Sequence, residues 1–149
     1  MRHTIFPTIA LLITLSYVQS ASADVAVAAY EHRPAVQNAL LTERLDTLLP
    51  RLMRETQIDM WLVIAREYND DTVFLSLVPK PRFTARRTTM LVFFDRGDAG
   101  VEKLTVSRYP LGSMYEAAWE GGDLNAQWRR LAEVIAEKNQ KTIAVNSSD

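Results

Sequence analysis

The sequence has no cysteine, and its two histidines are His3 and His32. The lack of cysteine excludes disulfides, thiolate zinc sites, a cysteine nucleophile and a lipoprotein anchor on cysteine. A serine–histidine–acid triad would depend on His32, and no other feature supports one. The chain also lacks an H-E-x-x-H motif, a glycine-rich phosphate loop and a G-x-S-x-G motif. The residues alone therefore predict no recognisable active site.

Neither sign of charge dominates, because 17 basic and 18 acidic residues give a formal net charge of -1. Binding to nucleic acid or to an acidic membrane through surface charge usually needs a strong basic excess. We therefore expect no nucleic-acid partner and no membrane association of the mature chain. The length of 149 residues is sufficient for one domain with a hydrophobic core.

The N-terminus has the three parts of a secretory signal peptide. A basic start at 1–3 precedes a mostly apolar stretch at 5–18 and the A-x-A pattern Ala21-Ser22-Ala23. The alternative is an uncleaved anchor, but this stretch is shorter than the roughly 20 residues that span a bilayer. We expect cleavage after Ala23 and a secreted or periplasmic location. A flexible leader at 24–34 and one domain at 35–149 would follow.

The first half of that domain is organised around an unbroken apolar run at residues 60–65. A run without polar alternation is typical of a strand buried on both faces of a sheet. An amphipathic helix is predicted before it, from Ala35 to about Thr56, with a kink at Pro50. Gln57 follows this helix at a position where glycine would suit a left-handed turn.

The second half predicts strands at 88–95, 101–109 and 142–146, the second of them nearer the sheet edge. Residues 110–122 have no regular period. Asp123 is a good N-cap for a second amphipathic helix, which ends near residue 139. This helix is expected to bury a stripe made of Leu124, Trp128, Leu131 and Ile135. Helices alternating with strands in this way predict an α/β fold.

An acidic cluster follows the central strand, where ligands often bind in such sheets. It consists of Glu67, Asp70 and Asp71, with Tyr68 and Asn69 between them. Two or three carboxylates could hold a hard metal ion. The pattern favours a different interpretation, in which Asn69 or Asp70 caps a short helix at 71–77 and the helix dipole favours the acids.

A second charged group, Arg82, Arg86 and Arg87, precedes the strand at 88–95. Guanidinium groups can recognise a carboxylate or a phosphate through paired hydrogen bonds. The more frequent alternative is a solvated rim, or pairing with acids of the same protein. Two aromatic residues of the irregular segment, Tyr115 and Trp119, either fill the core or face a partner, and their large apolar area favours the core.

Four stretches together resemble one protein family. They are Leu40-Leu41-Thr42-Glu43-Arg44-Leu45, Ile58-Asp59-Met60-Trp61-Leu62-Val63, Phe83-Thr84-Ala85-Arg86-Arg87-Thr88-Thr89 and Tyr115-Glu116-Ala117-Ala118-Trp119. These stretches resemble the sequence of the N-terminal, non-catalytic domain of the Xaa-Pro aminopeptidase, prolidase and creatinase family, in its secreted bacterial members. The resemblance covers about residues 35–149.

The resemblance implies a three-layer α/β/α domain around a mixed sheet, which shapes the active-site entrance and makes contacts in a homo-oligomer. Family members carry a C-terminal "pita-bread" domain with two divalent metals, manganese, cobalt or zinc, on two aspartates, a histidine and two glutamates. None of these ligands can be placed in this sequence, so no cofactor is expected in this chain. By the resemblance, the candidates to face substrate or a partner subunit are Arg86, Arg87, Tyr115 and Trp119.

Two functional hypotheses follow. In the first, the chain is the N-terminal domain of a secreted Xaa-Pro peptidase, a truncated product or partial gene model that lacks its catalytic partner domain and is inactive alone. In the second, it is a stand-alone secreted interaction or oligomerisation domain without catalysis.

Overall fold

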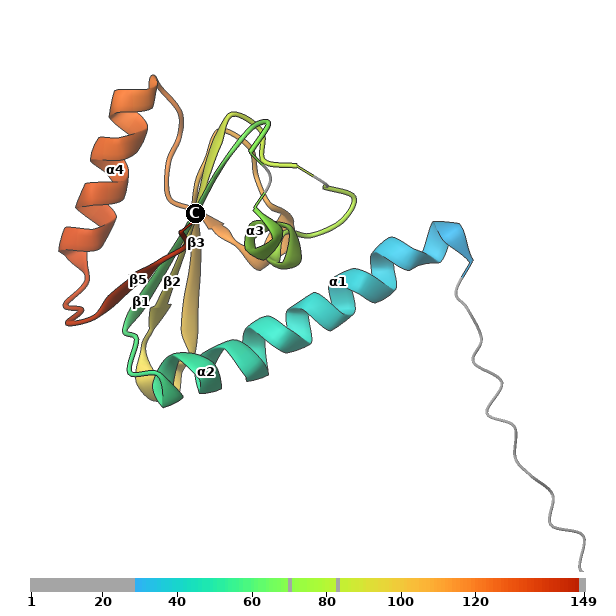
Figure 1. Cartoon of the computed structure of the whole chain (residues 1–149), viewed down its shortest axis with the longest axis horizontal. Coiled ribbons are helices and arrows are strands. Elements are labelled where there is room, and N and C mark those ends of the chain that lie inside the picture. Colours follow the sequence, from blue (N-terminus) through green and yellow to red (C-terminus); the bar gives the residue numbers. More distant parts are fainter. Residues whose placement is uncertain (1–28, 70, 83, 148–149) are drawn as a thin grey trace, which may run out of the picture.

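A mixed five-stranded sheet forms the centre of the computed structural model, which describes residues 29–69, 71–82 and 84–147 (Figure 1). The strand order is β4–β3–β2–β1–β5. The strands are β1 (Met60–Arg66), β2 (Thr88–Asp95), β3 (Val101–Val106), β4 (Glu116–Ala117) and β5 (Ile143–Val145). The predicted α/β class is confirmed, and helices on both faces of the sheet are compatible with three layers. The expected signal peptide at 1–23 lies outside the described residues.

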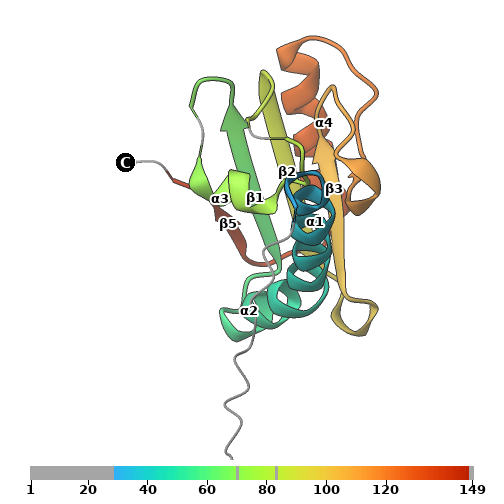
Figure 2. The same cartoon turned by 90° about the vertical axis from the view of Figure 1, so that its right-hand side faces the viewer.

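The sheet combines antiparallel and parallel pairs. β2 runs antiparallel to β1 and β3, and β5 is parallel to β1 (Figure 2). β4 is parallel to β3. Beyond β5, the side chain of Asn146 accepts a hydrogen bond from the Ile64 nitrogen at 2.8 Å and donates one to the Ile64 oxygen at 3.1 Å. This side chain continues the β5–β1 ladder. β4 lies within the segment for which the sequence predicted no regular structure.

The first helical layer is one long, irregular helix followed by a short one. Its parts are η1 (Tyr30–His32), α1 (Arg33–Glu43), the π-helical turn η2 (Arg44–Leu48), α2 (Leu49–Glu55) and α3 (Thr72–Leu77). The helix starts at Arg33, earlier than predicted, because the fixed φ of Pro34 suits a first helical turn. The irregularity predicted at Pro50 is the π turn before it, in which the Leu49 nitrogen donates to the Arg44 oxygen. No helix in the described ranges is long and apolar enough to cross a membrane.

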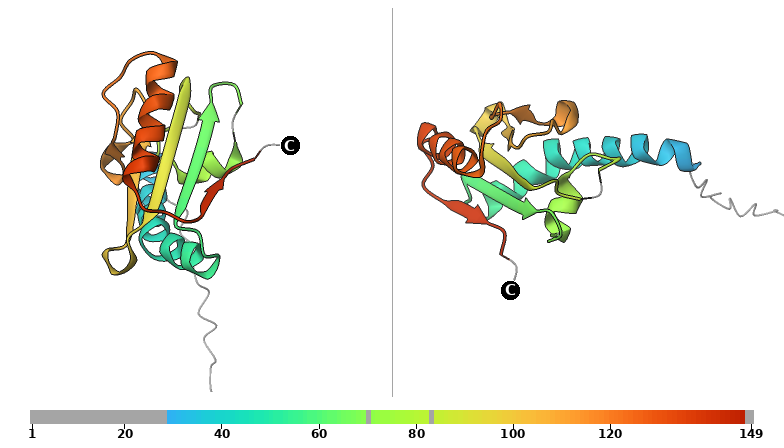
Figure 3. Two further views of the ribbon diagram at one scale, coloured as in Figure 1. Left: turned by 90° about the vertical axis from the view of Figure 1, so that its left-hand side faces the viewer. Right: turned by 90° about the horizontal axis from the view of Figure 1, so that it is seen from above.

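The second layer is the single helix α4 (Leu124–Glu137), which crosses the opposite face of the sheet (Figure 3). The predicted buried stripe is only partly right. Leu131 is buried, but Leu124 and Trp128 are 49% and 45% exposed, and the helix buries Gln127 and Val134 instead. The helix is therefore rotated from the position that its apolar residues alone would give.

The alternation of side chains along β1 divides the interior into two cores. Val63 and Ala65 point toward the long helix and α3, whereas Met60 and Leu62 point toward α4. β2 alternates in the same way, and its residues from Thr89 to Phe93 are all buried. The prediction that β1 is buried on both faces is confirmed.

The long helix ends in a left-handed residue, as the sequence predicted. Gln57 has φ 56°, and the Ile58 nitrogen donates to the Met53 oxygen at 2.8 Å, the 6→1 hydrogen bond of a Schellman motif. Glycine adopts this conformation without a steric penalty, whereas Gln57 carries a Cβ there.

We predict that Gln57→Gly stabilises the protein by about 0.5–1 kcal/mol, because the left-handed strain is removed from an exposed position. Urea unfolding measures the change. Glu55→Gly, in the last turn of α2, is the matched control and should destabilise by a similar amount. Equal effects of the two substitutions would contradict the prediction.

Two carboxylates secure the end of the sheet where β1 begins and β2 ends. Asp59 accepts hydrogen bonds from the nitrogens of Lys141 and Thr142 at 2.6 and 2.9 Å, which anchors the start of β5. These bonds lower the pKa of Asp59 below its ordinary value. The Arg54 guanidinium lowers the pKa of Asp95 in the same direction, through hydrogen bonds of 2.9 and 3.0 Å.

A carboxylate with a lowered folded-state pKa stabilises the protein above its unfolded pKa, and this stability is lost as pH falls through the folded value. We therefore predict that unfolding free energy declines below about pH 4. Asp59→Asn should flatten this decline in pH-dependent urea unfolding. Glu120→Gln, at an exposed residue, should leave the slope unchanged. An unchanged slope in Asp59→Asn would refute the assignment.

Candidate functional site

The two ends of the β1–β2 pair carry opposite charge. Asp59 and Asp95, at one end, are satisfied by backbone nitrogens and by Arg54. At the other end, Arg66 is the last residue of β1 and pairs with Thr88, the first residue of β2, which Arg87 precedes. Among the described residues, the guanidinium groups of Arg66 and Arg87 make no ion pair or hydrogen bond. The guanidinium groups at the basic end are therefore available to bind an anion.

A cavity of about 350 Å³ opens at this basic end, beside the start of α4. We call it the strand-end cavity. Its lining combines three arginines, two carboxylates and two aromatic rings with smaller side chains. The lining residues are Arg66, Glu67, Tyr68, Arg87, Thr88, Arg108, Trp119, Asp123, Leu124 and Gln127.

Two residues of the cavity adopt left-handed backbone conformations that side chains rarely take. Tyr68 has φ 67° and Arg87 has φ 55°. Tyr68 lies in a tight turn that the Asn69 nitrogen closes by donating to the Arg66 oxygen at 3.0 Å. The Tyr68 side chain is 95% exposed, so no packing offsets its strain. Uncompensated strain of this kind often occurs where a surface is used for binding.

The opposite wall is formed by Arg108 and Trp119. The Arg108 guanidinium donates to the Gly122 oxygen and lies 5.9 Å from the centroid of the Trp119 ring, in cation–π contact. Both carboxylates of the cavity already accept backbone hydrogen bonds. Glu67 accepts one from the Arg87 nitrogen at 3.3 Å, and Asp123, the N-cap of α4, accepts one from the Ala126 nitrogen at 2.7 Å.

Gln127 forms the floor of the cavity and fixes α4 on the sheet. Its side-chain amide is 4% exposed and donates to the Thr88 oxygen at 2.9 Å and to the Val106 oxygen at 2.7 Å. One amide therefore joins the helix to both β2 and β3 at the basic end. This pair of bonds explains why a polar residue replaces the predicted apolar stripe.

The structure divides the four residues predicted as candidates. Arg87 and Trp119 meet in the strand-end cavity. Arg86 instead stacks on Tyr109, with its guanidinium carbon 4.4 Å from the ring centroid. Tyr115 is 5% exposed, and its hydroxyl donates to the Leu77 oxygen at 2.6 Å. Burial raises the pKa of that hydroxyl, and the core interpretation of Tyr115 is confirmed.

Arg82 also lies apart from Arg87, because it donates to the Pro110 oxygen at 3.0 Å. Three cavity residues, Arg66, Arg108 and Gln127, were not singled out from the sequence. Arg66 was detectable in principle as the first charge after the apolar run of β1. Gln127 had no local signal, because its role depends on two distant carbonyls.

The acidic cluster after β1 acts locally. The N-cap of α3 is Asp71, not Asn69 or Asp70 as expected, and its side chain accepts a hydrogen bond from the Val73 nitrogen at 2.7 Å and another from Asn146. Asp70 lies outside the described residues. Within the described ranges, no group of three or more His, Asp or Glu side chains is placed to hold a metal ion.

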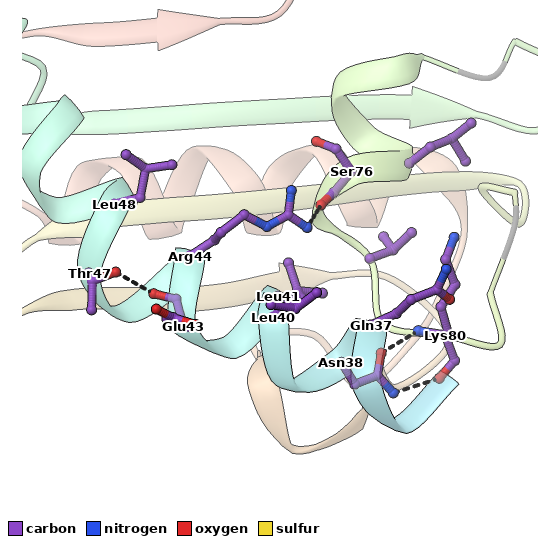
Figure 4. Close-up of a pocket in the computed structure, with 12 residues that line it drawn as sticks. Gln37, Asn38, Leu40, Leu41, Glu43, Arg44, Thr47, Leu48, Ser76 and Lys80 are labelled. Atoms are coloured by element: carbon purple, nitrogen blue, oxygen red, sulfur yellow. Dashed lines mark hydrogen bonds between the residues drawn. The ribbon is translucent and has the colours of Figure 1, made fainter. Parts of the chain in front are cut away.

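A second hollow, of about 590 Å³, lies between α1 and α3 (Figure 4). Its polar groups largely bond to one another. Asn38 exchanges two hydrogen bonds with the backbone of Lys80, at 2.7 and 3.0 Å, and Arg44 donates to the Ser76 oxygen at 3.2 Å. These contacts tie α1 to the segment around α3, so the hollow has a structural explanation that the strand-end cavity lacks.

Fold and site together define an α/β protein with a mixed five-stranded sheet and a basic, aromatic-lined cavity at one end of its central strands. Comparison with protein-family models, curated proteins and solved structures gave no match. The family resemblance stated from the sequence therefore stays a prediction.

We predict that Gln127→Met destabilises the protein by about 2 kcal/mol, because it removes a donor from two carbonyls at the helix–sheet contact. Chemical denaturation measures the loss. Asn125→Met, at an exposed position of the same helix, is the control and should change stability by less than about 0.5 kcal/mol. If both variants behave alike, Gln127 does not fix α4.

Proposed function

We propose that this chain is the N-terminal, non-catalytic domain of a secreted Xaa-Pro metallopeptidase of the aminopeptidase P and prolidase type. In this role it shapes the entrance to an active site carried by a separate C-terminal domain and contributes contacts between subunits. The two divalent metals, manganese, cobalt or zinc, belong to that other domain on this proposal. Two observations support the assignment. The sequence resembles this family in four stretches, and the α/β architecture is compatible with the family's N-terminal domain.

One structural observation carries the proposal furthest. The strand-end cavity brings together Arg87 and Trp119, which come from two separate stretches of sequence that resemble the family. It is bordered by the exposed ring of Tyr68 and is open to solvent. A surface with unpaired guanidinium groups and aromatic rings suits contact with a peptide on its way to a neighbouring active site.

The experiment compares the 149-residue chain with a longer expression product that continues through the downstream reading frame. Hydrolysis of an Xaa-Pro dipeptide is measured with added manganese. We predict hydrolysis by the longer product and none by the 149-residue chain, because the metal ligands would lie in the downstream domain. Metal-dependent hydrolysis by the 149-residue chain would refute the non-catalytic role.

The same assay tests the cavity. In the longer product, Trp119→Ala should raise KM for the peptide severalfold if the cavity lies at the active-site entrance, because an aromatic contact with the substrate is lost. Trp128→Ala, on the flank of α4 and outside the cavity lining, is the matched control and should leave KM unchanged. An equal effect of both substitutions would indicate a general loss of structure.

A second candidate function is a stand-alone secreted interaction or oligomerisation domain. The observation that favours it is β5, which among the described strands pairs with β1 alone and carries Ile143 and Val145 at 42% and 62% exposure. Unpaired edge strands with apolar side chains readily add another strand. Absence of hydrolysis in both products, with an unrelated gene downstream, would support this candidate over the peptidase domain.

A further inference from the structure

We propose that the strand-end cavity binds the carboxylate group of a peptide through Arg66 and Arg87, with Tyr68 and Trp119 beside the peptide. This inference deepens the proposed function by naming the group that the cavity recognises, and it rests on that proposal for the peptide nature of the ligand. Binding itself is a property of this chain and is measurable without catalysis.

Strand register brings the basic groups to one face. Side chains at even positions of β1, such as Met60 and Leu62, lie on the α4 face, so alternation places Arg66 on that face also. Arg66 pairs with Thr88, whose carbonyl is held by Gln127 of α4. The end of β1, the start of β2 and the first turn of α4 lie together at one end of the molecule (Figure 2).

The charge of the cavity favours a single negative charge. Arg66, Arg87 and Arg108 face two carboxylates, Glu67 and Asp123, which leaves an excess of one positive charge. Within the described residues, neither carboxylate forms an ion pair with Arg66 or Arg87, and each instead accepts a backbone hydrogen bond, so both guanidinium groups keep their donors available to a ligand. A monoanionic carboxylate matches this excess, whereas a doubly charged phosphate would also meet repulsion from the two acids.

The chemistry and size of the cavity agree with this ligand. A guanidinium group presents two parallel N–H donors that fit the two oxygens of a carboxylate. The volume of about 350 Å³ is in the range of small-molecule sites and is sufficient for the terminal residues of a peptide. The rings of Tyr68 and Trp119 offer apolar contact to the side chains of those residues.

The backbone supports the assignment independently. Within the described part of the chain, three non-glycine residues have positive φ, and two of them, Tyr68 and Arg87, line this cavity. The third, Gln57, is explained by the end of a helix. Tyr68 lies instead in the turn that Arg66 and Asn69 close, and this turn holds its nearly fully exposed ring at the border of the cavity, where it is accessible to a ligand.

The test is a titration of the full 149-residue chain, labelled with nitrogen-15, with the tetrapeptide Ala-Pro-Ala-Ala. The peptide is used as the free acid and as its C-terminal amide, and amide and indole chemical shifts are recorded. We expect saturable shifts at residues 66–69 and 87–88 and at the Trp119 indole with the free acid. The C-terminal amide should bind at least about tenfold more weakly, because a charge-assisted hydrogen bond pair is lost.

Two further probes identify the source and the kind of anion. Acetyl-Ala-Pro-Glu-Ala amide carries only a side-chain carboxylate, so equal binding of this peptide would support carboxylate recognition and assign it to acidic side chains. Inorganic phosphate tests for a general anion site. Phosphate that displaces the free-acid peptide at equal or lower concentration would overturn the carboxylate assignment.

Variants link the signal to the cavity. Arg66→Gln and Arg87→Gln should each weaken binding of the free acid about tenfold, whereas Arg129→Gln, at an exposed position of α4 outside the cavity, should not. Tyr68→Gly removes backbone strain, so it should fold stably and still bind more weakly. Equal binding of free acid and amide, or unchanged binding in both cavity arginine variants, would overturn the proposal.

The two proposals fail separately. Carboxylate binding with no peptidase activity in the longer expression product would retain this inference and remove the proposed function. Peptidase activity without carboxylate binding would do the reverse.

Discussion

The central constraint on this structure is that β1 and β2 have no face open to solvent. Helices on both sides bury the side chains of these strands, so polar chemistry is confined to the strand ends. One end carries Asp59 and Asp95, whose charges stabilise the fold locally. The other end carries Arg66 and Arg87, whose guanidinium groups make no ion pair or hydrogen bond within the described residues, and it is the end at which we propose binding.

Gln127 connects that constraint to the shape of the cavity. A helix fixed only by apolar contacts can slide or rotate by small amounts, because such contacts have little directionality. The two hydrogen bonds of the Gln127 amide have defined directions, and they set where the first turn of α4 lies relative to β2 and β3. In this orientation Leu124 and Trp128 are left partly exposed, whereas a helix placed by its apolar stripe alone would bury both side chains against the sheet.

Much of the scaffold could be predicted because its signals are local. The apolar run of β1 indicated burial on both faces, Gln57 indicated a left-handed turn, and a capped short helix after β1 was expected, although its cap is Asp71 rather than Asn69 or Asp70. The orientation of α4 could not be predicted, since periodicity does not reveal that a buried amide serves two carbonyls from other strands. The cavity was predicted only in part, because strand register brings Arg66 to Arg87 and the segment after β3 brings Arg108, all three being distant in the sequence.

The parallel pairing of β5 with β1 has a consequence for how the chain folds. Met60 pairs with Phe94 in the antiparallel part of the sheet but with Ile143 in the parallel part, so the second contact closes a much longer loop. Loop-closure entropy and high contact order make such a pairing late in folding. We therefore expect the β1–β2–β3 unit to form first, with β1 as an open edge until β5 pairs with it. During that interval, exposure of the β1 edge to other unfolded chains is governed by how quickly β5 pairs with β1 rather than by the stability of the finished sheet.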